Sequence, residues 1–301
     1  MQTTISTSDS YQIKLPSSDD GAMPDSFTLG PDHVVPAAAV DQFWTDGVVC
    51  LRNVMDEATI DALRVEADEA VEEGLDNPGP DVRFVKPEDG PGVFMYKFNT
   101  WRQQPAMRSM LFESHFPDIG AALMRSKSVT LHYTNTFVKD GGASETPWHE
   151  DASYSRMMGK QVMSIFLAYD HMPGETTIKY KQGSHLRDEP VYMGSTFQKG
   201  EEYGAWMDDH IPMPSQEELD ARFRTIYWEV SPGDALAFTQ RTLHGAPSNT
   251  LSTRRHATAF NLIGDDVAYD ARLGPVDSPG GLDPNISHGA HPAGKRFPKL
   301  R

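Results

Sequence analysis

Cysteine, positive charge and long apolar runs are all scarce in this chain of 301 residues. Its single cysteine, Cys50, excludes an internal disulfide framework and is typical of a reducing compartment. No apolar run approaches the roughly 18 residues that are needed to span a bilayer. Residues 1–20 are rich in Ser, Thr and Asp and lack the basic and apolar segments of a secretory signal. We therefore expect a cytoplasmic protein that does not contact membranes.

The charge balance is acidic, with 27 Lys and Arg residues against 43 Asp and Glu residues and a formal net charge of −16. Such a chain repels the phosphates of nucleic acid, and no basic stripe in the sequence compensates for that repulsion. We therefore exclude nucleic acid as a partner and expect a small-molecule substrate.

The periodic patterns predict helices first and strands afterwards. Ile60, Leu63, Ala67 and Val71 recur at helical spacing after Asp56, a good N-cap, and Gly74 is the natural stop. From residue 129 onward the pattern alternates, as in strands. Other predicted helices cover residues 37–44, 105–113 and 117–125, and the predicted strands cover 48–54, 129–139, 161–169, 176–181, 225–230, 235–242 and 256–263.

Helices followed by a block of antiparallel strands are typical of an α+β protein with a mainly β core. The simplest architecture is a double-stranded β-helix, a jelly-roll or cupin-like pair of sheets, with N-terminal helices flanking it. We expect one domain over residues 36–267. A flexible segment at residues 1–35 precedes it, and a coil tail at residues 268–301 follows it.

A Gly- and Pro-rich insert at residues 186–218 interrupts the predicted strands. A loop of this length in a compact domain is usually functional or disordered. Tyr203, Trp206 and Met207 make it a candidate lid over an apolar substrate, and a disordered surface loop is the alternative. Because the insert is net acidic, we do not expect it to bind the phosphates of an acyl-CoA.

Two histidines and an aspartate form the most informative group. His149 and Asp151 stand in Thr-Pro-Trp-His-Glu-Asp, and His244 stands in Thr-Leu-His-Gly-Ala. About one His-x-Asp is expected by chance in a chain of this composition, so the tripeptide alone carries little weight. The three residues, however, lie near the ends of different predicted strands. Two imidazoles and one carboxylate suit non-haem Fe(II) and leave coordination positions open for oxygen chemistry.

An arginine follows the last of these ligands. Arg255 stands eleven positions after His244 and can hold a carboxylate through two parallel hydrogen bonds. Arg254 is the alternative, since strand alternation points only one of the two side chains inward. The spacing favours Arg255 and predicts an acidic co-substrate beside the metal.

Several short segments resemble the phytanoyl-CoA dioxygenase family in order and spacing, over roughly residues 40–265. The resemblance implies a double-stranded β-helix, Fe(II) and 2-oxoglutarate as cofactor and co-substrate, and O₂ as oxidant. It also implies that His149, Asp151 and His244 hold the iron. The segments that carry it are Asp46-Gly-Val-Val, Phe137-Val-Lys139, Pro147-Trp-His-Glu-Asp151, Gln182-Gly-Ser-His185, Pro232-Gly-Asp234, His244-Gly245, Asn249 and Arg255.

The same resemblance implies roles around the co-substrate. Arg255 would bind the distal carboxylate of 2-oxoglutarate, Lys97 matches a family lysine that reaches it, and Phe166 falls where members place an aromatic ring over it. Many members also carry a hydroxyl residue two places after the distal histidine. Ala246 occupies that place here, and Tyr133 is a candidate replacement.

Two further side chains are assigned no role in the chemistry. Lys139 borders the glycines Gly141 and Gly142 and is interpreted as a surface charge. Glu150 lies between His149 and Asp151, where strand alternation points it away from the metal.

The predicted reaction is hydroxylation of a C–H bond in a small, apolar or natural-product-like metabolite, with release of succinate and CO₂. Halogenating relatives replace the iron-binding carboxylate with a small residue, so the presence of Asp151 favours oxygen insertion. Desaturation, epoxidation, ring formation and acyl-CoA hydroxylation remain alternatives. A non-catalytic jelly-roll protein that binds a metal is the alternative outside enzymes, and the clamp at Arg255 argues against it.

Overall fold

The computed structural model describes residues 23–77, 79–85, 92–195, 202–203, 210–272, 283 and 285–301. A large sheet and a small sheet dominate it, and both consist of antiparallel pairs except that β1 runs parallel to β2. The large sheet has the order β1 (Ser26–Thr28), β2 (Val48–Arg52), β13 (Ala235–Thr239), β8 (Val162–Ala168), β15 (Arg255–Ile263), β5 (Thr130–Lys139), β4 (Phe94–Phe98) and β3 (Val82–Val85). The small sheet has the order β12 (Thr225–Ile226), β9 (Lys179–Lys181), β14 (His244–Ala246) and β6 (Thr146–His149).

The two sheets pack face to face around an apolar interior. Side chains from β2, β8 and β13 of the large sheet meet Tyr180 of β9 and Ile226 of β12 in one buried cluster. Alternation along β8 sends Phe166 and Ala168 into this interior and Ile165 and Leu167 to the outer face. This arrangement confirms the predicted jelly roll.

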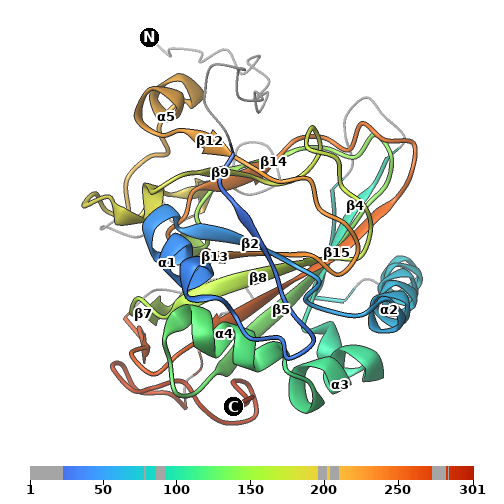
Figure 1. Cartoon of the computed structure of the whole chain (residues 1–301), viewed down its shortest axis with the longest axis horizontal. Coiled ribbons are helices and arrows are strands. Elements are labelled where there is room, and N and C mark those ends of the chain that lie inside the picture. Colours follow the sequence, from blue (N-terminus) through green and yellow to red (C-terminus); the bar gives the residue numbers. More distant parts are fainter. Residues whose placement is uncertain are drawn as a thin grey trace.

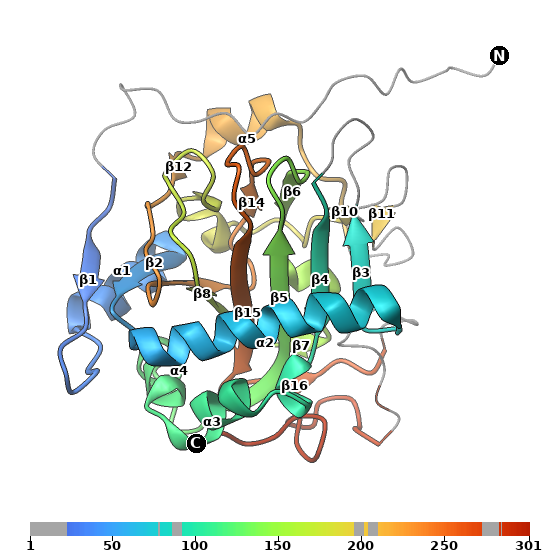
Figure 2. The same cartoon turned by 90° about the vertical axis from the view of Figure 1, so that its right-hand side faces the viewer.

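Helices cover the outer face of the large sheet (Figure 1). They are α1 (Ala37–Asp46), α2 (Glu57–Asp76), α3 (Pro105–Glu113) and α4 (Phe116–Met124). Helix α2 crosses β15, β5 and β4 (Figure 2). The Asp56 side chain caps its first turn by accepting a 2.8 Å hydrogen bond from the Thr59 N–H, as predicted. The apolar face of α2 buries Ile60 and Leu63, whereas Gly74 does not end the helix, which continues for two more residues.

The register of the large sheet decides which side chains reach the interior. Successive rows across β5, β15 and β8 alternate between the inner and outer faces, because directly paired residues point to the same side. Three inner rows are Phe137–Ala257–Ala168, Asn135–Ala259–Phe166 and Tyr133–Asn261–Ser164. A further inner pair, Lys139 opposite Arg255, continues the series towards the ends of β5 and β15.

Both predicted terminal segments are corrected in part. Ser26–Thr28 of the predicted flexible segment forms the edge strand β1, which pairs with β2. In the predicted coil tail, β16 (Ala268–Tyr269) pairs with β7 (Met157–Met158), and Tyr269 and Phe297 are buried in a small apolar cluster. Single aromatic residues anchor the tail, so no periodic pattern in the sequence marks it.

The predicted insert at residues 186–218 contains regular structure where the structure describes it. β10 (Gly194–Ser195) pairs with β11 (Glu202–Tyr203), and α5 (Gln216–Arg222) begins with a capping box between Ser215 and Glu218. Trp206 and Met207 lie outside the described residues, so the lid stays a prediction. Among the described helices, none is long and apolar enough to cross a membrane.

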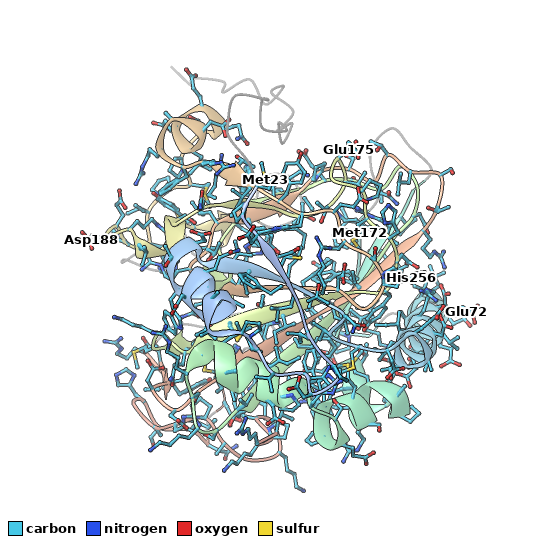
Figure 3. All side chains as sticks on the ribbon, viewed as in Figure 1. Met23, Glu72, Met172, Glu175, Asp188 and His256 are labelled. Carbon is cyan, nitrogen blue, oxygen red and sulfur yellow. The ribbon has the colours of Figure 1, made fainter. Side chains whose placement is uncertain are left out.

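A buried histidine ties α2 to the sheet. His256 of β15, labelled in Figure 3, lies on the outer face between two carboxylates. Its Nδ1 is 2.7 Å from Asp170 Oδ2 and its Nε2 is 3.1 Å from Asp68 Oδ1 of α2. Asp170 also accepts a 2.9 Å hydrogen bond from Arg64 Nε of α2. Burial opposes ionisation of Asp170, but the hydrogen bonds from His256 and Arg64 outweigh it and lower the pKa of this carboxyl below 3.8.

This network predicts a pH-dependent loss of stability on substitution of Asp170. Because the folded-state pKa is lowered, the stabilisation is present above pH 3.8 and is lost as the pH falls below it. We expect Asp170→Asn to lower the free energy of unfolding by about 2 kcal/mol near neutral pH. This loss of unfolding free energy should become smaller as the pH is lowered to about 3, as measured by urea unfolding of both proteins at each pH. The exposed Asp188→Asn is the control, and a deficit that is constant across this pH range would contradict the role of Asp170.

Candidate active site

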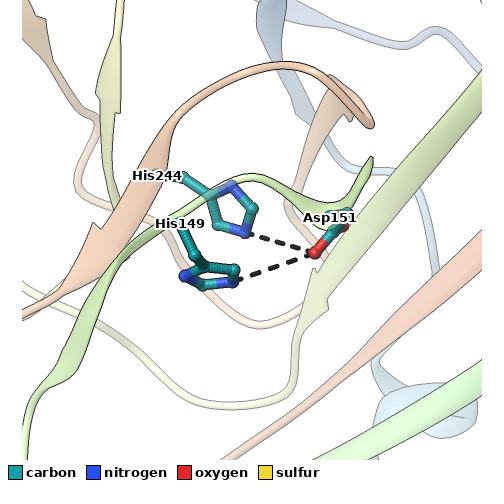
Figure 4. Close-up of side chains that lie close together, drawn as sticks. All are labelled: His149, Asp151 and His244. Atoms are coloured by element: carbon teal, nitrogen blue, oxygen red, sulfur yellow. Dashed lines mark ion pairs between the residues drawn. The ribbon is translucent and has the colours of Figure 1, made fainter. Parts of the chain in front are cut away.

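The two predicted metal-binding histidines lie side by side in the small sheet. His149 ends β6, His244 begins β14, and the two residues are paired directly across the strands. Asp151 begins the 3-10 turn Asp151–Tyr154 that follows β6. Asp151 Oδ1 is 3.8 Å from His149 Nε2 and 3.7 Å from His244 Nε2 (Figure 4). One ligand atom from each residue therefore lies within 4.8 Å of the others, a spacing that a single metal ion can bridge.

Hydrogen bonds fix the tautomer of both imidazoles. His149 Nδ1 lies 2.8 Å from the Pro147 carbonyl oxygen and His244 Nδ1 lies 2.9 Å from that of Thr242. A carbonyl oxygen only accepts, so each Nδ1 carries the proton and each Nε2 keeps its lone pair. Burial and the neighbouring His244 lower the pKa of His149 to about 4. The histidine is therefore neutral near pH 7, as a metal ligand must be.

The third ligand is held from the large sheet. Ser164 Oγ of β8 donates to Asp151 Oδ2 at 2.8 Å and lies 2.6 Å from Asn261 Oδ1 of β15. Asp151 Oδ1 remains directed at the histidines. The bond from Ser164 thus orients the carboxylate and connects the small sheet with the inner face of the large one.

Arg255 is a buried cation on the inner face. It is 6% exposed, and its Nη1 donates to the Thr176 carbonyl oxygen at 2.5 Å. Its Nε has no hydrogen-bond partner among the described residues. Burial lowers the pKa of Arg255 to about 10, which leaves it charged near neutral pH. Arg254 faces outward and pairs with Asp68 and Asp140, each at 2.8 Å. Of the two arginines, only Arg255 therefore offers unused N–H groups to an internal carboxylate.

Lys139 is not the surface charge that its neighbouring glycines indicated. It is 6% exposed and lies directly opposite Arg255, with Nζ 3.0 Å from Thr146 Oγ1 and 4.5 Å from the ring centroid of Phe94. Burial and the charge of Arg255 lower the pKa of Lys139 well below its usual value. The alternation of residues 129–139 places Lys139 on the same face as Phe137, a signal that could have revealed it.

The structure does not bring Lys97 to the site. Lys97 alternates with Tyr96 and Phe98 on β4, lies on the outer face of the sheet, and its Nζ pairs with Glu73 of α2. The expectation that Lys97 reaches the co-substrate is therefore corrected. The reason is local, because the inner positions of β4 are taken by aromatic side chains.

Phe166 and Tyr133 both lie on the inner face, as expected for residues near the co-substrate. The Phe166 ring stacks on Phe137, with a centroid distance of 6.3 Å. Tyr133 is paired with Asn261, and both burial and the charge of Asp151 raise the pKa of its phenol. Tyr133 thus stands at the metal end of the inner face.

Tyr180 was missed in the sequence. It is fully buried on β9 directly opposite His244, and its hydroxyl has no partner among the described residues. Burial and the charge of Asp151 raise the pKa of Tyr180 well above its usual value. A partnerless hydroxyl beside the distal histidine can supply the hydrogen bond that Ala246 cannot make. Only the pairing of β9 with β14 reveals this position.

Glu150 points away from the metal ligands, as strand alternation predicts. It is fully buried, and its carboxylate binds Arg187, Arg241 Nε at 3.1 Å and the Tyr192 N–H at 2.7 Å. Arg187 also donates to the Arg241 carbonyl oxygen at 3.0 Å. The cluster connects the strand of His149 with the turn that leads to His244 and so stabilises their mutual position.

The bond from Ser164 generates a prediction for metal affinity. Ser164→Ala leaves Asp151 without its orienting donor, and we expect the dissociation constant for Co(II) or for Fe(II) under anaerobic conditions to rise about tenfold. Ser109→Ala, on the exposed face of α3, is the control. An unchanged metal affinity in a folded Ser164→Ala protein would show that the bond does not orient the ligand.

The chain matches the phytanoyl-CoA dioxygenase (PhyH) family over residues 43–257. No curated protein gives a match. The fold is similar to that of SnoK, a non-haem α-ketoglutarate dependent carbocyclase from nogalamycin biosynthesis, with 19% identity, a TM-score of 0.67, and 89% of this chain and 97% of that one covered.

Two other similar structures contain the co-substrate. The epimerase SnoN, in complex with Fe3+, α-ketoglutarate and nogalamycin RO, is 22% identical, with a TM-score of 0.65 and coverage of 88% and 98%. EctD from S. alaskensis, with 2-oxoglutarate and 5-hydroxyectoine, is 17% identical, with a TM-score of 0.62 and coverage of 93% and 96%. These likenesses agree with the jelly roll, and the family match spans most of the chain. The protein belongs to the phytanoyl-CoA dioxygenase family of 2-oxoglutarate-dependent non-haem iron enzymes.

Proposed function

We propose that this enzyme hydroxylates a C–H bond of a small, apolar or natural-product-like metabolite. The balanced reaction is R–H + 2-oxoglutarate + O₂ → R–OH + succinate + CO₂. The observation that carries the proposal is that the interior between the two sheets has two features. It has a His-Asp-His group whose ligand atoms converge, and it has the buried cation Arg255 with N–H groups to spare.

The residues present fit an iron ion. His149 Nε2, His244 Nε2 and Asp151 Oδ1 would hold it, and such a set leaves coordination positions for a chelating co-substrate and O₂. When bound, the iron supplies the redox chemistry with O₂. The chain's own contribution is to keep both imidazoles neutral and to orient the carboxylate through Ser164. Asp151 also fills the place that a halide would need, which favours oxygen insertion over halogenation.

The distal carboxylate of 2-oxoglutarate would be bound by Arg255 and Lys139. Both side chains are buried on the inner face, and the charge of Arg255 lowers the pKa of Lys139 although Glu145 acts in the opposite direction. A carboxylate between them would satisfy the free Nε of Arg255. Phe166 would pack against the carbon chain, and the Tyr180 or Tyr133 hydroxyl would replace the donor that is missing at Ala246.

Binding of 2-oxoglutarate tests this site directly. Anaerobic enzyme with Fe(II) and 2-oxoglutarate should develop a weak visible charge-transfer band. Arg255→Gln should raise the dissociation constant for 2-oxoglutarate at least about 100-fold, because it removes one half of a buried charge pair. Lys139→Met should raise it about tenfold. Arg254→Gln, on the outer face, is the matched control and should bind as the unaltered enzyme does. Equal affinities in all three variants, or no band in the unaltered enzyme, would contradict the proposal.

The reaction type is tested with any compound that stimulates succinate formation in air. Hydroxylation predicts a product heavier by one oxygen atom, and that atom should come from isotopically labelled O₂ (mass spectrometry). A product that lacks two hydrogen atoms and carries no label would instead indicate desaturation or ring formation.

A further inference from the structure

A continuous wall of aromatic rings lines the inner face of β4 and β5. We call it the aromatic lane. Neighbouring rings along it have centroid distances between 5.6 and 6.3 Å. Its members are Phe94, Tyr96 and Phe98 of β4, Tyr133 and Phe137 of β5, and Phe166 of β8.

The lane remains partly accessible although it faces inward. Tyr96, Phe98 and Tyr133 are only half-buried, whereas Met95 on the outer face of the same strand is 1% exposed under α2. Large apolar side chains are normally buried as fully as their position allows. These three rings line the inside of the jelly roll and keep exposed surface. Their surface is therefore available for contact with a ligand, because the packing of the core does not cover it.

The lane begins at the metal ligands. Tyr133 is paired with Asn261, and Asn261 lies 2.6 Å from Ser164 Oγ, which binds Asp151 at 2.8 Å. A molecule lying on Phe98 and Tyr133 would thus have one edge beside the His-Asp-His group. The opposite end of the lane, at Phe94, adjoins Lys139.

Polar groups within the lane are few and uncharged. Asn135 lies on the same face, paired with Phe98, and its buried Oδ1 has no partner among the described residues. An amide oxygen accepts, so its natural complement is a ligand hydroxyl. The nearest cation at the sheet edge is Arg83, paired with Tyr96, and its guanidinium donates to the backbone oxygens of Pro80 and Val82. Near Phe98 and Tyr133 the lane thus offers ring stacking and the unpaired acceptor Asn135 Oδ1, whereas the cation Lys139 lies at the opposite end, beside Phe94.

We infer that the part of the aromatic lane nearest the metal ligands, formed by Phe98 and Tyr133, is the substrate subsite and that it takes a planar, uncharged aromatic ring system bearing a hydroxyl group. The ring system stacks on Phe98 and Tyr133, and its hydroxyl donates to Asn135 Oδ1. The flat shape is selected because offset and edge-to-face contacts between rings add to simple apolar burial. This inference rests on the proposed function, since it places the substrate beside the proposed iron ligands.

The experiment compares two probes of the same carbon skeleton. Anaerobic enzyme loaded with Fe(II) and 2-oxoglutarate is titrated with 2-naphthol and with decahydro-2-naphthol, which is saturated and not flat. Naphthalene serves as the probe without a hydroxyl. We expect 2-naphthol to bind at least about tenfold more tightly than either of the other two. It should also perturb the charge-transfer band, because the lane begins at the metal ligands.

Variants on the two faces of β4 and on β5 separate recognition from stability. Phe98→Leu should weaken 2-naphthol binding about tenfold and abolish its preference over decahydro-2-naphthol. Asn135→Ala should make 2-naphthol and naphthalene bind equally. Met95→Leu, on the outer face of the same strand as Phe98, is the matched control and should change neither preference. If Phe98→Leu does not fold, Tyr96→Leu gives the same test on the neighbouring ring of the lane.

The outcomes distinguish this inference from the proposed function. A charge-transfer band with equal binding of 2-naphthol and decahydro-2-naphthol would overturn the aromatic subsite and leave the iron site standing. The aromatic subsite would also be overturned if Phe98→Leu kept the tenfold preference for 2-naphthol over decahydro-2-naphthol. Absence of the band itself would instead contradict the proposed function.

Discussion

The pairing of β15 with β5 and β8 is the constraint on which the rest of the structure depends. One register turns Arg255 and Asn261 inward and His256 outward. A slip by one residue would exchange these faces, because side chains alternate along a strand. Arg255 would then lie towards α2, and His256 would replace it in the interior. The outward cluster of His256, Asp68 and Asp170 opposes such a slip, so the network that docks α2 also sets the orientation of the site.

The interior contains two kinds of buried charged group, an anion with cationic partners and a pair of neighbouring cations. Glu150 is fully buried but is matched by two arginines and a backbone N–H, so its cluster stabilises the turn around the metal ligands. Arg255 and Lys139 are buried beside each other, and burial together with the charge of Arg255 lowers the pKa of Lys139 although Glu145 acts in the opposite direction. A fold retains such a pair where an anion completes it. These two adjacent buried cations are therefore the strongest physical sign of an acidic co-substrate in this chain.

Much of this site could be predicted from residue types and spacing. The rest depends on which strands pair with one another and in which register. His149, Asp151 and His244 lie together as predicted because two of them end or begin neighbouring strands. The prediction that Lys97 reaches the co-substrate was wrong because the segment around it was not predicted as a strand. Its alternation with the aromatic residues of that strand was therefore not seen. Tyr180 was missed because its position opposite His244 is a fact of register between distant segments. Likewise, the aromatic lane joins β4, β5 and β8, which no local pattern connects.

The central claim is that the interior between the two sheets holds both the metal and the carboxylate of the co-substrate. The most direct measurement is a crystal structure of the anaerobic enzyme with Fe(II) and 2-oxoglutarate. We predict density for iron between His149, Asp151 and His244, with the distal carboxylate of 2-oxoglutarate on Arg255 Nε and close to Lys139 Nζ. Iron at the three ligands with the co-substrate bound elsewhere, and Arg255 still bonded only to the Thr176 carbonyl, would contradict the claim.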